Sequence, residues 1–306
     1  MIIVFGSNVV DLFFHLAEMP AADQAIHLDS HTEAPGGKGQ NQAVAAAKAG
    51  AQVRFFGAVG DGGHGRQMLK NLQNHGINTS GIAILDHAPT AIATIFVNDA
   101  NGTHRVVVSQ GANRFARQET VSDTLLGKNT TLLLQAELAL TETAELIRRA
   151  REKGCERVVV NLAPFHELPD EMLKNINYLV MNEHEASSLA AHIGINFDGF
   201  DDLAIKFHAR YALTPIITLG ENGVVAYHNE QLHKRPALPI KAVDTIGAGD
   251  AFCGFFSAAI DNGKSFEEAL QEAIVAGSLA CTQVGAQSAI PSAEAVKTYL
   301  QNEKAA

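Results

Sequence analysis

The sequence predicts an α/β fold, with a mostly parallel central sheet, helices on both faces and a small β flap at one edge. Short apolar runs alternate with helical patterns along most of the 306 residues, and this alternation is typical of βα units that build a parallel sheet. Two segments, residues 11–35 and 90–109, break the alternation and resemble strands outside the main sheet. No internal repeat or linker divides the chain, so we expect one domain over residues 1–306, with these two segments as its lid.

The strands of the central sheet are predicted from short apolar runs. Runs of this length without polar alternation are typical of strands that are buried on both faces. The runs are MIIVFG from Met1, VRFFGAVG from Val53, TLLLQAE from Thr131, RVVVN from Arg157, YLVMN from Tyr178 and PIITLG from Pro215.

Helical patterns occupy the intervals between these runs. Two of them, HGRQMLKNLQNHG and ETAELIRRAREKG, end on glycine, the residue that most often closes a helix. A third, NQAVAAAKAG, is rich in alanine and is opened by Asn41, and the chain from Gly249 onward has the pattern of three more helices. Residues 90–109 instead contain two strand-like runs around Asn-Asp-Ala-Asn-Gly, which predicts a hairpin in the flap.

The composition excludes several classes of partner. With 23 basic and 33 acidic residues the formal charge is -10, which argues against nucleic-acid binding. No lysine or arginine precedes Lys38, so a basic secretory start is missing, and the apolar runs are too short to span a bilayer. The cysteines are far apart and not in metal-ligand spacing, which indicates reduced thiols. A soluble cytoplasmic protein without a membrane partner is expected.

The stretch VDTIGAGDAF, residues 243–252, is the most informative motif. It lacks the Gly-Lys-Ser/Thr of a Walker A loop and the third glycine of a dinucleotide fingerprint. A glycine turn at a helix N-terminus remains, and its backbone N–H groups can bind an anion. Asp250 in the first helical turn has two interpretations. It offsets the helix dipole, or it takes a proton from a hydroxyl that attacks a phosphoryl group held by the turn.

DTIGAGDAF resembles the C-terminal signature of the ribokinase-like carbohydrate kinases, Asp-Thr-x-Gly-Ala-Gly-Asp. The resemblance spans nearly the whole chain, from GSNVVD at Gly6 to GAQSAIP, and its five short motifs occur in the expected order. It implies a ribokinase-like fold and ATP-dependent phosphorylation of a sugar. It also implies that Asp250 is the catalytic base and that the anion hole is formed by Gly247, Ala248 and Gly249.

A second glycine cluster, PGGKGQNQA from Pro35, lets the backbone approach a ligand closely, or simply forms a close-packed helix start. The resemblance favours a sugar site here. Gln40 replaces a residue that is often small in the family, so it either alters the pocket or faces away. The residues implied to bind the sugar are Asp11, Gly37, Lys38, Gly39, Asn41, Glu137 and Asp250.

The resemblance also implies sites for ATP and for cations. The spacing of Asn182 and Glu185 is that of a helix capping box, and Glu185 is implied to organise Mg²⁺ through water. The glycines of TLGENG are turn formers or nucleotide contacts. The implied ATP-binding residues are Asn182, Thr218, Gly220, Gly223 and Gly249. A monovalent cation, expected to be K⁺, is implied at Asp244, Ile246, Ala280, Gln283 and Gly285, although Ala289 stands where ribokinases usually offer a hydroxyl.

The identity of the sugar depends on GSNVVD, which matches the family's Gly-Ser-x-Asn-x-Asp imperfectly. Asp11 fits, but Val9 replaces the asparagine, and Asn8 lies one place early. An apolar residue leaves a sugar hydroxyl unpaired, so Val9 favours a sugar that lacks one hydroxyl, as in deoxyribokinases. Asn8 swinging in, or a bridging water, would restore the contact. The expected acceptor is therefore the primary hydroxyl of ribose or 2-deoxyribose.

Other functions stay open at this point. One is a kinase for a nucleoside or a hexose. Another is a sugar-binding sensor without turnover, against which the retained Asp250 argues. The edge strands of the flap are able to pair with those of a second subunit, and relatives are often dimers, so a homodimer through the lid is one expected assembly.

Overall fold

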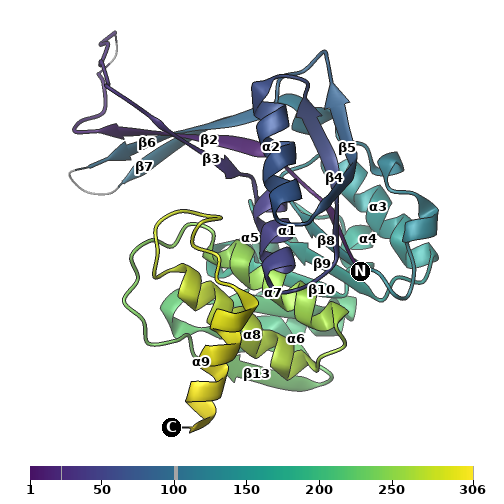
Figure 1. Cartoon of the computed structure of the whole chain (residues 1–306). Coiled ribbons are helices and arrows are strands. Elements are labelled where there is room, and N and C mark those ends of the chain that lie inside the picture. Colours follow the sequence, from purple (N-terminus) through teal and green to yellow (C-terminus); the bar gives the residue numbers. More distant parts are fainter. Residues whose placement is uncertain (22, 100–102, 306) are drawn as a thin grey trace.

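The computed structural model describes residues 1–21, 23–99 and 103–305, with no side chains described for 303–305. It has the predicted α/β architecture, with one large sheet and a second small one (Figure 1). In these residues the large sheet has nine strands in the order β13-β12-β11-β10-β9-β8-β1-β4-β5. They are β1 (Ile2–Phe5), β4 (Val53–Gly60), β5 (Asn78–Leu85), β8 (Thr131–Gln135), β9 (Arg157–Asn161), β10 (Tyr178–Asn182), β11 (Thr214–Thr218), β12 (Val224–His228) and β13 (Gln231–Arg235).

The pairing from β5 to β11 is parallel throughout, whereas β12 and β13 are antiparallel at one edge. In the centre, Val4 of β1 lies opposite Phe55 of β4 and Leu133 of β8. Every residue of β1 is at most 1% exposed, as expected for a strand covered on both faces. Because the carboxyl ends of parallel strands meet at one edge of the sheet, ligands of such folds bind there.

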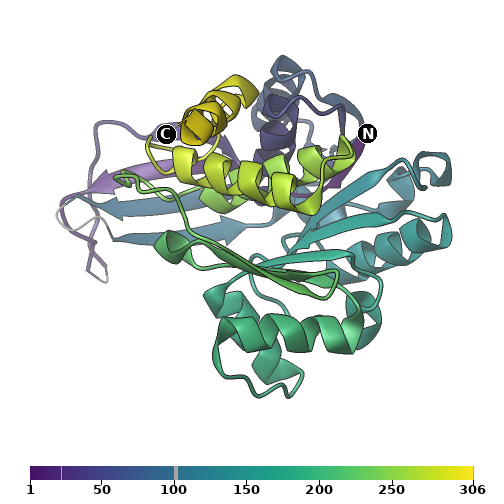
Figure 2. The same cartoon turned by 90° about the horizontal axis from the view of Figure 1, so that it is seen from below.

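Helices cover the two faces of this sheet (Figure 2). Alternate residues of β1 belong to different cores: Ile2 and Val4 to one, Ile3 and Phe5 to the other. The first core is closed by α1 (Lys38–Lys48), α2 (Gly63–Asn74), α7 (Ala248–Asp261), α8 (Phe266–Ala280) and α9 (Ala293–Ala305). The second is closed by α3 (Leu140–Glu152), α4 (Asp170–Leu173), α5 (Glu183–His192) and α6 (Gly199–Tyr211). Short 3₁₀ turns are η1 (Gly111–Phe115), η2 (Gln118–Thr120), η3 (Asp123–Leu125) and η4 (Gly220–Asn222).

Glycines with positive φ mark several helix ends. The predicted closures of α2 and α3 are confirmed at Gly76 and Gly154, with φ of 71° and 81°. The predicted starts of two helices were late. Helix α1 begins at Lys38 rather than Asn41, because Gly37 takes a φ of 87° and caps it. Helix α7 begins at Ala248 rather than Gly249, since Gly247 is its cap.

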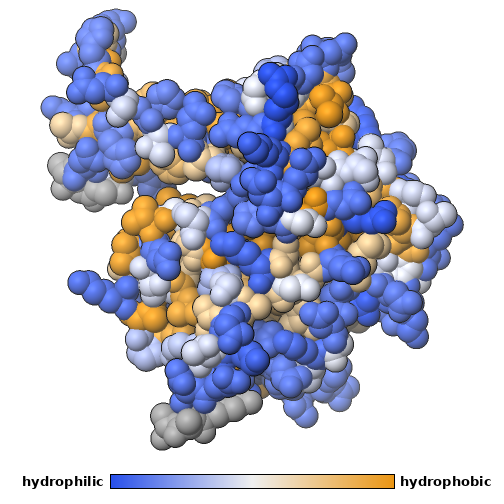
Figure 3. Space-filling view, in the orientation of Figure 1, coloured by the Kyte–Doolittle hydropathy of each residue, from blue (hydrophilic) through white to orange (hydrophobic). Residues whose placement is uncertain are grey.

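The small sheet contains β2 (Val9–Leu16), β3 (Thr32–Gly36), β6 (Ala91–Asn98) and β7 (His104–Ser109) in the order β3-β2-β6-β7. The predicted hairpin is confirmed by the antiparallel pairing of β6 and β7, and residues 100–102 of its turn lie outside the described residues. This sheet stands away from the body (Figure 1), and a hollow separates the two in the space-filling view (Figure 3). In the part of the chain that the structure describes, no helix has the length and hydropathy needed to cross a membrane.

Candidate active site

The N-terminus of α7 forms the glycine turn that the sequence predicts. Gly247 has a φ of 78°, and a Cβ on it would lie 2.9 Å from the Cα of Ala286. Gly249 by contrast faces open space, since no atom outside its chain neighbours and the nearby backbone of α7 lies within 4 Å of the corresponding position. The first N–H groups of a helix have no acceptor within the helix, although the N–H of Ala248 donates to the carbonyl of Thr245, before the helix, at 3.3 Å. This end is able to receive an anion, which would share the Ala248 N–H with that carbonyl.

Asp250, in the first turn of α7, is held on both carboxylate oxygens. Asn41 donates from Nδ2 to Oδ2 at 2.9 Å, and Gln42 donates from Nε2 to Oδ1 at 2.9 Å. The residue is only 6% exposed. A carboxylate offers about four acceptor positions, so two protein donors leave Asp250 able to accept from a further hydroxyl.

Acidic groups gather around Lys38 at the start of α1. Burial alone lowers the pKa of Lys38, but the nearby carboxylates of Asp250, Glu137 and Glu185 raise it above its ordinary value. Burial raises the pKa of Glu137, whose carboxylate accepts from Ser7 Oγ and, at 2.8 Å, from the backbone N–H of Lys38. The sequence-predicted Lys38, Glu137 and Asp250 therefore share one region.

Asp11 belongs to the same cluster. Burial, and then the charges of Glu137 and Asp250, raise its pKa to about 7, although Lys38 opposes the shift. The side chain lies against Gly36, where a Cβ would stand 2.0 Å from Asp11 Oδ2. A side chain at position 36 would therefore displace the Asp11 carboxylate from this place.

Packing explains part of the glycine cluster independently of any ligand. A Cβ on Gly39 would lie 2.4 Å from the backbone nitrogen of Ser7, and one on Gly37 would lie 3.0 Å from Val9 Cγ2. Gly37 also needs its positive φ to cap α1. The ligand-binding and helix-start interpretations of PGGKGQNQA are thus compatible.

Val9 and Asn8 occupy different surroundings. Val9 shares the face of β2 that carries Asp11 and packs with Ala91 and Ala93 of the small sheet. Asn8 is fully buried, and its side chain donates to the carbonyl of Ala58 at 3.5 Å and accepts from Gln40 Nε2 at 2.9 Å.

The backbone of Asn8 is fixed as well, because Asn113 accepts from its N–H at 3.1 Å and donates to its carbonyl at 3.0 Å. Gln40 is 0% exposed and turned toward Asn8, Asn71 and Gln287. Of the two alternatives for Gln40, the structure favours the one in which it faces away from the pocket.

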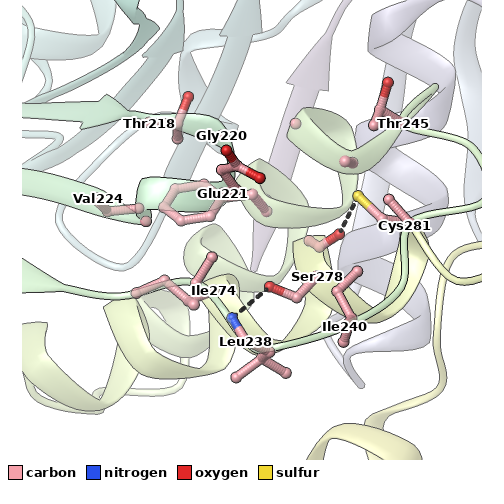
Figure 4. Close-up of a pocket in the computed structure, with 17 residues that line it drawn as sticks. Thr218, Gly220, Glu221, Val224, Leu238, Ile240, Thr245, Ile274, Ser278 and Cys281 are labelled. Atoms are coloured by element: carbon pink, nitrogen blue, oxygen red, sulfur yellow. Dashed lines mark hydrogen bonds between the residues drawn. The ribbon is translucent and has the colours of Figure 1, made fainter.

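A cavity of about 540 Å³ lies beside the N-terminus of α7 (Figure 4). Its lining is mainly apolar, with Leu238, Ile240 and Ile274 on one side and Thr218 at the end of β11. The backbone N–H of Leu238 donates a hydrogen bond to Ser278 Oγ at 3.3 Å, which holds this side of the cavity in place. Of the residues that the sequence suggests for ATP, those that line it are Thr218, Gly220, Gly223 and Gly249.

Asn182, the fifth of those residues, is not among the residues that line this cavity. Its Oδ1 accepts from the N–H of Glu185 at 2.8 Å, and Glu185 Oε2 accepts from the N–H of Asn182 at 2.8 Å. The two residues therefore form the predicted capping box of α5. Burial raises the pKa of Glu185, a carboxylate that also interacts with Lys38.

Four of the five positions suggested for a monovalent cation lie on two adjoining loops, and the fifth, Ala280, is the last residue of α8. Asp244 joins the loops, since its Oδ1 accepts from the N–H of Ile246 at 3.0 Å and its Oδ2 from the N–H of Gly285 at 2.9 Å. The backbone N–H of Gln283 donates a hydrogen bond to the carbonyl of Ala280 at 3.4 Å. Carboxylate and carbonyl oxygens suit a hard cation, so these residues fit K⁺ chemically.

The sequence analysis missed the amide side chains around Asp250. Gln42 is fully buried, accepts from Gln135 Nε2 at 2.8 Å and donates to Asn161 Oδ1 at 3.0 Å as well as to Asp250. Gln287 donates to Asn41 at 3.0 Å. The one signal for Gln42 was its place in the run Gln-Asn-Gln within a helix otherwise rich in alanine.

Comparisons with known proteins identify the family of the chain. A sequence model of the family described as pfkB family carbohydrate kinase matches residues 1–293. The chain is 33% identical over 307 residues to a deoxyribokinase of Salmonella typhi, covering 98% of each protein. It is 34% identical over 301 residues to a ribokinase of Bacillus subtilis, covering 98% of this chain and 99% of that protein. A solved structure of Arabidopsis thaliana ribokinase, complexed with ribose and ATP, superposes with a TM-score of 0.87 at 26% identity and 98% coverage of both chains.

Proposed function

Because the chain belongs to the pfkB family of carbohydrate kinases, we propose that it transfers the γ-phosphoryl group of ATP to the primary hydroxyl of a pentose, and that 2-deoxyribose is preferred over ribose. The observation that carries the preference is Val9 beside Asp11. Asn8, which would have to replace the missing amide, is fully buried and paired at its side chain and its backbone.

Asp250 is the proposed base. A hydroxyl that binds one of its remaining acceptor positions can lose its proton to the carboxylate as the oxygen attacks the γ-phosphorus. In a loose transition state the proton leaves late, so a carboxylate is a sufficient base. The developing charge on the phosphoryl oxygens is stabilised by the N–H groups of Gly247, Ala248 and Gly249 at the start of α7.

Sugar recognition is proposed to use the polar cluster around Lys38. Asp11 and Glu137 accept from sugar hydroxyls, and Asn41 contributes its side-chain amide. The backbone of Gly37, Lys38 and Gly39 lies close to this cluster and supplies further contacts. Charged acceptors bind hydroxyls more strongly than neutral ones, which suits a small polar substrate.

The adenosine part of ATP is proposed to fill the cavity beside α7, whose apolar lining suits a purine. Thr218, Gly220 and Gly223 would contact the nucleotide, and Asn182 its phosphates. Glu185 would hold Mg²⁺ through water. When bound, Mg²⁺ neutralises phosphate charge and orients the γ-phosphoryl group.

The loops that carry Asp244 and Gly285 would hold K⁺. The second of these loops also packs directly against the glycine turn, so closely that a Cβ on Gly247 would touch Ala286. A bound K⁺ would therefore also stabilise the glycine turn.

The small sheet is proposed to act as a lid over the sugar, with residues 1–306 forming one domain. Val106, Val107 and Val108 of its edge strand β7 are 48%, 64% and 51% exposed, so a homodimer through the lid is part of the proposal. Cys155, Cys253 and Cys281 are free thiols, in keeping with a reducing cytoplasm.

The test is ADP release from Mg-ATP with K⁺, measured on ribose and 2-deoxyribose side by side. We expect kcat/KM to favour 2-deoxyribose by roughly tenfold to a hundredfold, the range over which an apolar pocket rejects an added hydroxyl. Val9→Asn should move the ratio toward ribose, whereas the control Val9→Ile should not.

A wild-type preference for ribose would refute the interpretation of Val9 but would still support a pentose kinase. Activity on neither sugar would refute a pentose as the substrate, and hexoses and nucleosides would then be tested. Sugar binding without any ADP release would indicate a sensor.

A further inference from the structure

Buried side-chain amides connect Asp250 to the C-terminal loop that spans residues 282–290. Asn41 donates to Asp250 Oδ2 at 2.9 Å, and its own Oδ1 accepts from Gln287 Nε2 at 3.0 Å. Asp250 and Asn41 are 6% exposed, and Gln287 is 9% exposed. Removing one partner of a buried hydrogen bond costs more free energy than the bond itself contributes. Gln287 therefore strongly stabilises the observed orientation of the Asn41 side chain.

The direction of each amide in this series is set by its neighbour. Asn71 Nδ2 donates to Gln287 Oε1 at 2.8 Å, so Gln287 presents its nitrogen to Asn41. Asn41 in turn presents its oxygen to Gln287 and its nitrogen to the carboxylate. If the Asn41 amide were flipped, its oxygen would face the Asp250 carboxylate and its nitrogen would face the nitrogen of Gln287. Both contacts would be repulsive.

The loop that carries Gln287 is fastened to the same helix as Asn41. Lys48 Nζ, in the last turn of α1, donates to the carbonyl of Gln287 at 3.3 Å and to that of Ile290 at 2.8 Å. Gln287 is therefore fixed to α1 by its backbone and by its side chain, and its distance to Asn41 is set by two independent attachments.

We propose that Gln287 is a positioning residue for phosphoryl transfer. It holds the Asn41 amide in the orientation that gives Asp250 a hydrogen-bond donor, and it thereby fixes the carboxylate for the incoming hydroxyl. The inference rests on the proposed function, because it assigns Gln287 a part in the reaction of Asp250. It connects the 282–290 loop to the base through Asn41, by a route separate from the cation positions at Asp244 and Gly285.

Gln287→Met tests the inference, since methionine has nearly the same length but cannot donate. With the better pentose, we expect kcat to fall roughly tenfold, as for loss of one partner in a buried hydrogen bond, while KM for ATP stays within about twofold of wild type. Gln118→Met is the matched control. Gln118 is also buried, but its side-chain oxygen accepts from Arg149 of α3 rather than from the amides around Asp250, so the kcat of this variant should stay within about twofold of wild type.

A double-mutant cycle separates positioning from packing. In an Asn41→Ala background, Gln287→Met should lower kcat by less than about twofold, because the group that Gln287 positions is absent. The inference would be overturned by equal losses of kcat in both backgrounds, by an equal loss in the Gln118 control, or by wild-type kcat in Gln287→Met. Each of these outcomes leaves the kinase assignment intact.

A measurement without turnover keeps the inference testable if the pentose assignment itself fails. In protein labelled with ¹⁵N-asparagine, the side-chain amide of Asn41 should exchange slowly with solvent in the wild type and markedly faster in Gln287→Met. Unchanged exchange would overturn the inference on structural grounds alone.

Discussion

The clearest consequence of the carboxylate cluster is a pH-dependent affinity for the sugar. Burial, Glu137 and Asp250 raise the pKa of Asp11 from 3.8 to about 7. If the ionised carboxylate accepts from sugar hydroxyls, protonation removes the binding form. KM for the pentose should then be constant above pH 8 and rise as pH falls, to about twice that value at pH 7 and about ten times at pH 6.

The assay is steady-state kinetics between pH 5.5 and 8.5 at saturating Mg-ATP, with KM for ATP as an internal control. Asp11→Asn should bind the pentose weakly and show a flat KM over the same range. A wild-type KM for the sugar that is independent of pH, or an equal dependence in Asp11→Asn, would refute the assignment of Asp11 as an ionised acceptor.

The same shift has an effect on stability whose sign is opposite to the usual carboxylate case. Because the folded-state pKa of Asp11 is raised, folded protein binds more protons than unfolded protein between pH 4 and 7. The free energy of unfolding therefore decreases as the pH rises from 4 to 7. Above pH 7 the ionised Asp11 lowers the free energy of unfolding by at most about 4 kcal/mol, at 1.36 kcal/mol per pH unit. Asp11→Asn avoids this cost, so its Tm should exceed that of the wild type at pH 8 but not at pH 4.

Two further predictions concern the start of α7. Asp250→Asn should lower kcat by roughly 10²- to 10⁴-fold, the usual contribution of a general base, while calorimetry shows pentose binding retained. Undiminished turnover would refute the catalytic assignment. Gly247→Ala should lower both Tm and kcat, because φ is 78° and the new Cβ would meet the backbone of Ala286 at 2.9 Å. Gly263, beyond the other end of α7, has a φ of 75° and open space around it, so Gly263→Ala should lower Tm but spare kcat.

Strands buried on both faces were predictable from sequence because their burial is a property of the strand itself. Each residue of β8 and β10 except Tyr178 and Asn182 is buried, and each strand reads as an apolar run. The edge strand β13 was missed, since QLHKR is exposed at four of five positions and pairs with β12 alone. Its strand conformation depends on a partner rather than on its own composition.

The geometry of the candidate site was predictable where residues belong to a recognisable motif. Gly247 and Asp250 lie in one motif, and their geometry follows from a helix start. The partners of Asp250 were not predictable, because Gln42 is 208 positions away along the chain and a glutamine carries no local sign of what it contacts. Asn8 shows the same limit. The sequence leaves its orientation open, and the contacts with Ala58, Gln40 and Asn113 decide it.

The electrostatics of the site explain why an acidic chain can place a carboxylate beside an anion-binding turn. Asp11, Glu137, Glu185 and Asp250 all lie near Lys38, whose single positive charge cannot balance them. Adding the phosphates of ATP makes the deficit larger, and Coulomb repulsion in a buried site is poorly screened. Protonation of Asp11 relieves part of this repulsion in the free protein, and bound cations would relieve the rest once ATP arrives. In the proposed function, a requirement for Mg²⁺ and K⁺ would arise from the same carboxylates that are proposed to recognise the sugar and accept its proton. The anion that Asp250 would face then arrives already neutralised in part, which lessens the repulsion between that anion and the carboxylates of the site.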